Sequence, residues 1–356
     1  MSIGYAKEKL TRAVDSLATR QAAQDSIVNA RLENSEPGTL SRRTTMKHIV
    51  VKLLALIALA CSLATTARAE SFAKRVDIGG GRMMYIECHG SGSPTVLLIS
   101  GTDTASDLWH AADQKGPTVY DDIQKTTRVC AYDRPGAPHL DQTFSRSDPV
   151  PQPTSPQNGV NDLVALLKAA DVPGPYVLVA HSFSGTIARV FAGEHPDEVK
   201  GIVFVDVLTP ELRAQMTPEE WKTWKRINAR PATALAAYPD LERQDFDETL
   251  DQTAAAAALR PMPVVVLTAS DKFIDVVPKL IQAGELPPDT PPDFGAVVDR
   301  ANSAAQNELA ALVPGAVHIT DTHSGHNIMI DNAPVVIQAI RMVVDAVRAG
   351  QTSLKR

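Results

Sequence analysis

The sequence predicts an α/β fold in which helices cover both faces of a mostly parallel sheet. Short apolar runs alternate with helix-compatible segments along the chain, which is the element order of such a fold. Most of the apolar runs are continuous rather than alternating, as expected for strands that are buried on both faces. Residues 70–356 are long enough to form one large domain with a substantial core.

Residues 46–69 have the layout of an export signal. A basic start with Lys47 and Lys52 accompanies an apolar run, and the small-residue cleavage site Ala67-Arg68-Ala69 follows. The apolar run is too short to span a bilayer comfortably. We therefore expect an exported protein whose mature part begins near Glu70 and which keeps no stable membrane span after cleavage.

Two export routes remain open, because translation of the N-terminal extension at 1–69 can start at Met1 or at Met46. Residues 41–47 resemble a twin-arginine signal, although Thr45 stands where that motif usually has an aromatic residue. Alternatively, Met46 is the true start and the signal is an ordinary secretory one. Both routes lead to a periplasmic or secreted protein.

The predicted mature part is acidic and contains only two cysteines. Residues 70–356 carry 25 Lys and Arg against 36 Asp and Glu, a formal net charge of −11. Such a surface repels phosphate backbones, so nucleic acid is excluded as a partner. Cys88 and Cys130 are compatible with a disulfide in an oxidising compartment, and two buried thiols are the alternative.

The predicted strands are mostly rich in Val, Ile and Leu. They lie at 84–88, 95–100, 128–132, 176–180, 201–205, 264–268 and 316–320. The spacing of apolar residues predicts helices over 159–170 and 186–193. A last helix begins at Pro334 and ends at Gly350, which are typical residues for a helix start and end.

Three stretches interrupt this alternation. Residues 207–262 separate two strands by more than a simple crossover needs, and they contain helical pieces around 221–227 and 254–259. We interpret this insertion as a helical cap over the edge of the sheet. The Pro-rich stretch 148–156 predicts a rigid connector, and 287–292 predicts a second surface excursion.

Ser182 is the predicted nucleophile. The predicted strand at 176–180 runs into a turn with small residues, Ala180 and Ser184, two positions on either side of Ser182, and a helix begins near Gly185. Such a turn imposes strained backbone angles on the serine and exposes its hydroxyl, and the helix N-terminus favours developing negative charge. Ser184 is a weaker candidate, because one of its own flanking positions is the larger Thr186.

A serine nucleophile needs a general base, and His326 is the best-placed histidine. It lies in a loop directly after the last predicted strand, where functional groups of such sheets collect. His323 competes in the same loop. We interpret His318 as a structural histidine of the strand, and His181 as a residue that packs under the nucleophile turn.

Two carboxylates are candidates for orienting the base. Asp271 follows the strand at 264–268 and Asp206 follows the strand at 201–205, and both preserve the chain order Ser, Asp, His. Asp271 is preferred, because the strand before it is the one after which the acid of a Ser, Asp, His arrangement usually lies. Asp206 is the alternative.

The oxyanion of the reaction needs two preorganised N–H donors. The backbone N–H of Phe183, directly after the nucleophile, can provide one. The tight turn after the strand at 95–100 can provide the other, which we assign to Thr102, with Gly101 allowing a close approach.

Four stretches, 90–101, 129–136, 180–185 and 324–326, resemble the α/β-hydrolase superfamily and look most like its bacterial exported members. The resemblance spans roughly residues 75 to 349. It implies an α/β-hydrolase fold with an eight-stranded sheet in which the strands of Cys88 and Cys130 are neighbours, so a disulfide between them becomes sensible. It also implies that 133–136 form a structural turn at the rim of the site.

The prediction for function is a serine hydrolase that cleaves an ester or related acyl group of a small molecule through an acyl-enzyme. Amide cleavage, acyl transfer and perhydrolysis by the same residues are alternatives, and so is a non-catalytic binding protein of the same fold. The resemblance implies an aspartate nucleophile for dehalogenation or epoxide opening, and Ser182 argues against both. Neither a metal nor an organic cofactor is expected: His and Cys lack ligand-like clustering, and the glycines at 79–81 precede a strand rather than follow one.

Overall fold

The computed structural model describes residues 71–113, 116–229, 235, 238 and 240–354, and each structural statement below concerns these residues. The predicted N-terminal extension and export signal at 1–69 lie outside them. None of the helices in this described part combines the length and the apolar character needed to cross a membrane.

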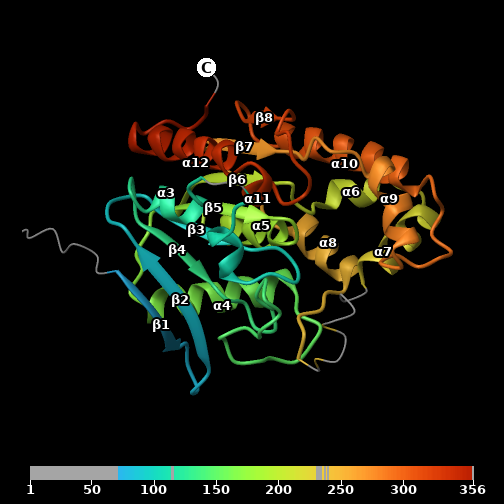
Figure 1. The fold of residues 1–356 in the computed structure, drawn as a ribbon. Helices are drawn as coiled ribbons and strands as arrows, with labels where there is room; N and C mark the ends of the chain where they lie inside the picture. Colours follow the sequence, from blue (N-terminus) through green and yellow to red (C-terminus); the bar gives the residue numbers. More distant parts are fainter. Residues whose placement is uncertain (1–70, 114–115, 230–234, 236–237, 239, 355–356) are drawn as a thin grey trace, which may run out of the picture. The chain divides into compact units, whose positions relative to one another are not determined.

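The centre of the structure is one eight-stranded sheet with the order β1-β2-β4-β3-β5-β6-β7-β8 (Figure 1). Strands β1, β2 and β4 pair antiparallel, and every pair from β4 to β8 is parallel. The predicted α/β class with a mostly parallel sheet is therefore confirmed. The strands are β1 (Phe72–Asp77), β2 (Met83–His89), β3 (Thr95–Ile99), β4 (Val129–Tyr132), β5 (Tyr176–His181), β6 (Val199–Val205), β7 (Val264–Leu267) and β8 (Val317–Ile319).

All seven strands expected from the pattern are present within two residues at either end, and β1 is the strand that the pattern misses. Most side chains of β1 are exposed, because the strand lies at an edge of the sheet and pairs only with β2. An exposed edge strand needs no apolar run, so the sequence carries no signal for it.

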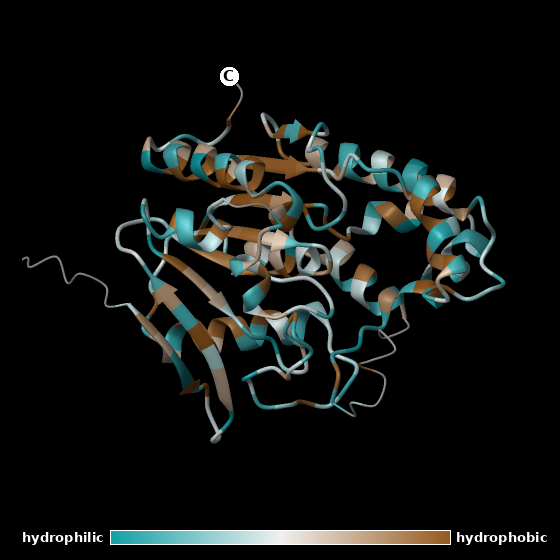
Figure 2. Ribbon diagram, viewed as in Figure 1, coloured by the Kyte–Doolittle hydropathy of each residue, from teal (hydrophilic) through white to brown (hydrophobic). Residues whose placement is uncertain are grey.

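The strands bury both of their faces, which explains why their apolar runs are continuous. In β3, Val96 and Leu98 belong to a core cluster that α12 and α3 complete on one face of the sheet. Leu97 and Ile99 belong to a second cluster, shared with α4, α5 and α10 on the other face. Figure 2 shows the central strands β5 to β7 as predominantly hydrophobic and α12 as mixed.

The helices include those predicted near the nucleophile and at the C-terminus, and others that the pattern did not reveal. They are η1 (Ser106–His110), α3 (Val119–Ile123), α4 (Pro156–Ala169), α5 (Ser184–Glu194), α6 (Pro210–Ala214), α7 (Pro218–Asn228), α8 (Phe246–Ala255), α9 (Phe273–Gln282), α10 (Phe294–Ala311), α11 (Ile328–Asp331) and α12 (Ala333–Arg348). The first turn of α4 is fixed by a capping box between Ser155 and Asn158.

The long insertion between β6 and β7 contains α6, α7 and α8. The helix expected around 254–259 is wrong in position, because α8 ends at Ala255. The Asp245 carboxylate caps α8 by accepting from two backbone N–H groups of its first turn, and Phe246 and Leu250 anchor its buried side. The alanine run has high helix propensity but buries little surface, and packing outweighs propensity in short helices.

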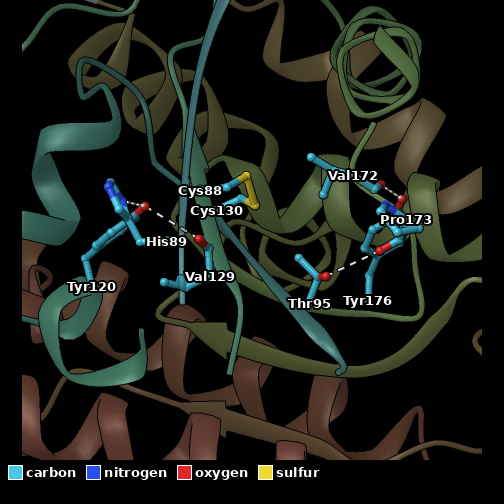
Figure 3. Close-up of a disulfide and its surroundings, with 9 residues drawn as sticks. All are labelled: Cys88, His89, Thr95, Tyr120, Val129, Cys130, Val172, Pro173 and Tyr176. Carbon is cyan, nitrogen blue, oxygen red and sulfur yellow. Dashed lines mark hydrogen bonds between the residues drawn. A yellow bond between two sulfur atoms is a disulfide. The ribbon is translucent and has the colours of Figure 1, made fainter. Parts of the chain in front are cut away.

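Cys88 on β2 and Cys130 on β4 lie directly opposite each other and form a disulfide (Figure 3). The two cysteines are 42 residues apart in the sequence. A cross-link that closes a loop of this length restricts the unfolded chain and is expected to stabilise the fold by about 2–4 kcal/mol.

We therefore expect the double variant Cys88→Ala/Cys130→Ala to lose about 2–4 kcal/mol of unfolding free energy, because its unfolded chain is no longer restricted. Urea unfolding of the variant beside the unreduced wild type measures this loss. Intact mass after alkylation without reductant is the control, and the mature wild type, which lacks Cys61, should take up no label. Two alkylated cysteines in the unreduced protein would contradict the disulfide.

Candidate active site

Ser182 occupies the sharp turn between β5 and α5. Its φ of +54° lies in the left-handed region, which is strained for a residue other than glycine. The surrounding chain imposes this conformation, because the Ser182 N–H donates to the Val205 carbonyl at 3.2 Å and its own carbonyl accepts from the Leu208 N–H at 2.8 Å. A strained serine between a buried strand and a helix is the arrangement that exposes a nucleophilic hydroxyl.

Close packing around the turn requires small residues. A Cβ on Gly185 would lie 2.4 Å from Cβ of Val207, so a larger residue there would push α5 away from the segment after β6. Ser184 is fully buried and its hydroxyl donates to the Ile99 carbonyl at 2.7 Å. The hydroxyl of Ser184 is therefore engaged in the fold and inaccessible, whereas Ser182 is only partly buried.

The imidazole of His326 is hydrogen-bonded to the carboxylate of Asp206, with 2.6 Å between Nδ1 and Oδ2. Asp206 is buried, and its Oδ1 accepts from the Ala269 N–H at 3.1 Å and from the Asn302 amide at 3.3 Å. Burial alone would raise the pKa of Asp206, but the bond from His326 and these two further bonds outweigh it and lower the pKa below its ordinary value. The carboxylate is thus held ionised beside the imidazole.

The structure reverses the order of preference between the two candidate acids. The side chain of Asp271 is exposed, while its backbone N–H donates to the Ser324 carbonyl at 3.0 Å and so helps to hold the loop that carries His326. Asp206 directly follows the last residue of β6, whereas β7 ends four residues before Asp271. A carboxylate next to a strand end is held close to the sheet edge, and this proximity was the available signal for Asp206.

The other histidines near the site have other surroundings. The His323 side chain is 78% exposed and pairs with Asp321. His181 is buried, and its Nε2 lies 3.1 Å from the His326 carbonyl oxygen, which can only accept, so Nε2 carries the proton. Burial lowers the pKa of His181 to about 3, so the ring is neutral. Its hydrogen bond to the His326 carbonyl supports the loop that carries the base. His318 contacts the Thr268 hydroxyl at 2.8 Å.

The loop after β3 lies directly against the nucleophile. A Cβ on Gly101 would lie 2.8 Å from Cβ of Ser182, so only glycine allows this approach. Within the part of the chain that the structure describes, neither the Thr102 N–H nor the Phe183 N–H donates to an acceptor. Asp103, next in the loop, has a φ of +55°, and it is a further strained residue beside the site.

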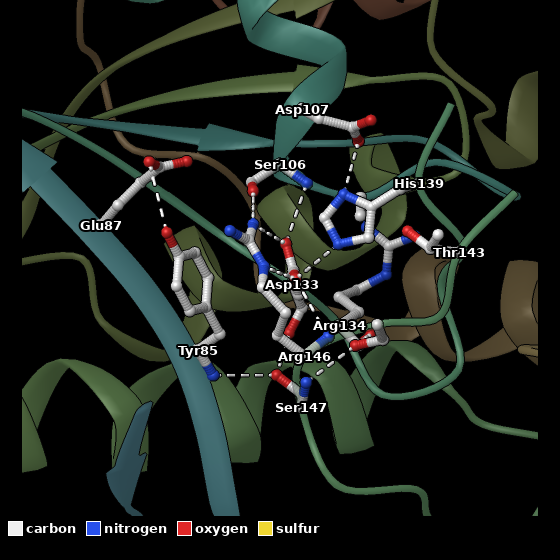
Figure 4. A network of polar contacts seen from close by, with 12 residues as sticks. Tyr85, Glu87, Ser106, Asp107, Asp133, Arg134, His139, Thr143, Arg146 and Ser147 are labelled. Carbon is white, nitrogen blue, oxygen red and sulfur yellow. Dashed lines mark hydrogen bonds and ion pairs between the residues drawn. The ribbon is translucent and has the colours of Figure 1, made fainter. Parts of the chain in front are cut away.

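The segment after β4 is fixed by a buried carboxylate, as Figure 4 shows. Asp133 is fully buried and accepts from the Ser106 N–H at 3.1 Å, from Arg146 Nε at 2.7 Å and from His139 Nε2 at 3.1 Å. Burial would raise the pKa of Asp133, but the bonds from His139 and Arg146 outweigh it and hold the pKa well below its ordinary value. The network joins the turn after β4 to η1.

This network makes stability depend on the protonation of His139. The hydrogen bond to Asp133 raises the pKa of His139 above its ordinary value. The contribution of the charged imidazole is therefore complete below the pKa of about 6.5 that His139 has in the unfolded chain, and it is lost as the pH rises through the folded-state pKa.

We expect His139→Gln to destabilise the protein more at about pH 5.5 than at about pH 8.5, because only the acidic condition contains the lost ion pair. Urea midpoints of both proteins at the two pH values measure the difference. An equal loss at both values would show that the protonation of His139 contributes nothing.

Together these groups have the parts needed for acyl transfer: a strained serine, a histidine bonded to a buried carboxylate, and two unpaired N–H groups. The His326 side chain is 41% exposed, so a substrate and water can reach it. Among the described residues, no hydrogen bond joins the Ser182 hydroxyl to His326, and such contacts often tighten only when substrate is bound. Nor do these residues include a cluster of three or more His, Cys, Asp and Glu suited to a metal ion.

A sequence model described as the alpha/beta hydrolase family matches residues 89–339, more than half of the chain. An uncharacterised protein of Schizosaccharomyces pombe is 37% identical over 144 residues, 35% of this chain and 26% of that protein. The uncharacterised protein YbdG of Bacillus subtilis is 30% identical over 138 residues, 38% of each chain. The chain thus spans well under half the length of these relatives. The solved structure of Est816, an N-acyl homoserine lactone degrading enzyme, is 16% identical with a TM-score of 0.49, covering 75% of this chain and 99% of that one.

Proposed function

Since the chain belongs to the alpha/beta hydrolase family, we propose that it is a serine hydrolase that cleaves an ester or related acyl substrate through an acyl-enzyme intermediate. The observation that carries the proposal is the buried Asp206 bonded to His326 at 2.6 Å, in a fold that holds Ser182 in a strained turn. In serine hydrolases, a carboxylate-oriented histidine of this kind activates the serine hydroxyl.

In the proposed reaction, Nε2 of His326 takes the proton of the Ser182 hydroxyl while Oγ attacks the acyl carbonyl carbon. The carbonyl oxygen becomes an oxyanion and accepts hydrogen bonds from the N–H groups of Thr102 and Phe183. The imidazolium then gives its proton to the leaving alkoxide, so the alcohol departs and the acyl group stays on Oγ. His326 then deprotonates a water molecule that attacks the acyl carbon, and the imidazolium returns this proton to Oγ of Ser182 as the acid leaves.

Asp206 has two roles in this scheme. Its bond to Nδ1 fixes the tautomer of His326 in which Nε2 is unprotonated and can accept the serine proton. Its negative charge stabilises the imidazolium that forms in each half of the reaction. The lowered pKa keeps Asp206 ionised while the imidazole gains and loses its proton.

The acyl pocket is proposed to lie beneath the insertion at 207–262. The insertion begins next to the nucleophile, because the Leu208 N–H donates to the Ser182 carbonyl. Its helix α7 carries Trp221 and Trp224, which stack with 4.8 Å between ring centroids. We expect the substrate to be a small molecule whose acyl group fits between the insertion and the end of the sheet.

A panel of p-nitrophenyl esters of graded acyl length, from acetate to laurate, tests the proposal on wild type and Ser182→Ala. Turnover that depends on Ser182 supports it, and the preferred length reports the depth of the pocket. The same panel with anilides, with an added alcohol and with hydrogen peroxide separates amide cleavage, acyl transfer and perhydrolysis. A lack of turnover on every substrate, together with saturable binding of an ester, would favour the non-catalytic binding protein.

Export from the cytoplasm is part of the proposal. It is supported by the signal-like sequence at 46–69 and by the disulfide, a bond that persists in oxidising compartments. N-terminal sequencing of the protein recovered from the periplasm or medium of a bacterial host should find a start near Glu70. Retention of the whole chain in the cytoplasm would contradict export.

A further inference from the structure

The guanidinium of Arg134 is buried beside the loop after β3 and makes hydrogen bonds with several of its N–H groups. Its Nε and Nη2 each donate to one carboxylate oxygen of Glu242 at 2.7 Å, in a two-pronged contact. Nη1 donates to the Ser100 carbonyl, and Nη2 also donates to the Gly101 carbonyl at 2.7 Å. The side chains of Arg134 and Glu242 are only 4% and 3% exposed.

The contact with Gly101 fixes the direction of a catalytically important N–H. The Gly101 carbonyl and the Thr102 N–H belong to one planar trans peptide, so they point in opposite directions. A donor that holds the carbonyl therefore aims the N–H away from Arg134. The hydroxyl of Thr104 donates to the same Gly101 carbonyl at 3.0 Å, so two side chains hold this one peptide.

Arg134 also lies near the side chain of Phe183, the residue whose backbone N–H is the second proposed oxyanion donor. Its guanidinium carbon is 5.7 Å from the centre of the Phe183 ring, within range of a cation–π contact. One side chain thus contacts the loop after β3 and the residue after the nucleophile. A planar guanidinium can bind two carbonyls and a carboxylate at once, which a lysine ammonium cannot do in this geometry.

We propose that Arg134, oriented by Glu242, is a positioning residue that sets the direction of the Thr102 N–H and so builds the oxyanion hole. This inference rests on the proposed function. Donation to the Gly101 carbonyl also polarises the peptide and makes its N–H a stronger donor. Glu242 belongs to the insertion between β6 and β7, so the ion pair links the insertion to the reacting centre.

The strained backbone of the loop explains why such an anchor is needed. Asp103, immediately after Thr102, is held at a φ of +55°, and a loop in this conformation relaxes unless its neighbours over-determine it. Removing Arg134 frees the Gly101 carbonyl from one of its two donors. The loop can then rotate, and a displacement of about 1 Å at a reacting centre costs on the order of 10²-fold in rate.

The test uses variants chosen so that loss of folding and loss of positioning are separated. Arg134→Met alone would leave the charge of Glu242 buried and unpaired, which strongly destabilises proteins. The double variant Arg134→Met/Glu242→Met removes both charges. Thr104→Val keeps the ion pair and removes only the second donor. Arg82→Met is the matched control, because it breaks a two-pronged ion pair with Asp162 and removes none of the hydrogen bonds to the Gly101 carbonyl.

Kinetics on the preferred ester give the first readout. The double variant should lose about 10²-fold in kcat with KM within about threefold, because the hole acts in the transition state rather than in the ground state. Thr104→Val should lose about two- to tenfold in kcat, the effect of one hydrogen bond. Arg82→Met should keep wild-type kinetics. A wild-type kcat in a folded double variant and in Thr104→Val would overturn the inference.

Amide hydrogen exchange over residues 100–105 gives a second readout that needs no activity. The segment should exchange faster in the double variant and in Thr104→Val than in wild type or Arg82→Met. Unchanged exchange in both would overturn the inference by itself. Failure of the proposed function would give a different result: hydrolysis that survives Ser182→Ala, or no hydrolysis by the wild type. In either case, the exchange rates still decide whether Arg134 holds the loop. If the double variant does not fold, Thr104→Val still tests whether hydrogen bonds to the Gly101 carbonyl control the loop and the rate.

Discussion

Replacing Ser182 with alanine is expected to lower kcat/KM for the best ester by at least about 10⁴-fold. The alanine cannot form the acyl-enzyme, so the remaining rate comes only from substrate binding and the oxyanion donors. The fold should be retained, because the Ser182 contacts that hold the turn come from its backbone N–H and carbonyl. Initial rates at low substrate concentration on highly purified protein measure the loss.

The control for this variant is Ser155→Ala, which removes the N-cap of α4 and none of the hydrogen bonds of Ser182, His326 or Asp206. It should cost about 1 kcal/mol of stability and leave kcat/KM unchanged. Retention of the wild-type rate by Ser182→Ala would show that Ser182 is not the nucleophile. Equal losses in both variants would point to a general sensitivity of the fold instead.

Replacing Asp206 with asparagine is expected to lower kcat by about 10³–10⁴-fold while KM changes by less than about threefold. The amide has nearly the same shape, but its NH₂ group can turn His326 to the wrong tautomer, and its neutral side chain cannot stabilise the imidazolium. Steady-state kinetics on the same ester measure both constants. Circular dichroism checks that the fold is intact.

Asp271→Asn is the matched control for Asp206→Asn. The side chain of Asp271 is exposed and its contribution to the base loop is a backbone N–H, which the substitution keeps. Its kcat should stay within about threefold of wild type. A large loss in Asp271→Asn together with a small loss in Asp206→Asn would restore the order of preference drawn from the sequence.

The lowered pKa of Asp206 also predicts how the two proteins respond to acid. The pKa is below its ordinary value in the folded state, so the stabilisation from the carboxylate is present above the unfolded-state pKa of about 3.9. It is lost as the pH falls through the folded-state pKa. The stability difference between wild type and Asp206→Asn should therefore shrink in this acidic range.

Much of the fold could be predicted from the sequence, because strands buried on both faces leave a strong signal. The runs of β3, β5 and β6 are apolar on every residue or nearly so, and their bounds were close to those observed. Strand β1 could not be predicted, since its stability comes from backbone pairing with β2 rather than from burial. The sequence pattern placed α8 too late in the chain, because it followed the alanine run. The observed position depends instead on the Asp245 cap and on two buried side chains.

The candidate site could be predicted where its residues are neighbours along the chain. It could not be predicted where it depends on the distance in space between residues that are far apart in the sequence. The serine turn is encoded by small residues beside one strand end, so Ser182 could be singled out. The choice between Asp206 and Asp271 depended on which carboxylate reaches the imidazole, and local sequence does not contain that distance. Arg134 was interpreted only as part of a turn, because its partner Glu242 lies 108 residues further along the chain.

The most direct test of the central claim is to treat the mature protein with a fluorophosphonate, a probe that reacts with activated serines, and to locate the adduct by peptide mass spectrometry. We expect one adduct, on the peptide that contains Ser182. It should form in Asp271→Asn, form much more slowly in Asp206→Asn, and be absent in Ser182→Ala. No adduct on the folded wild type, or an adduct that persists in Ser182→Ala, would contradict the assignment of Ser182, His326 and Asp206 as the reacting groups.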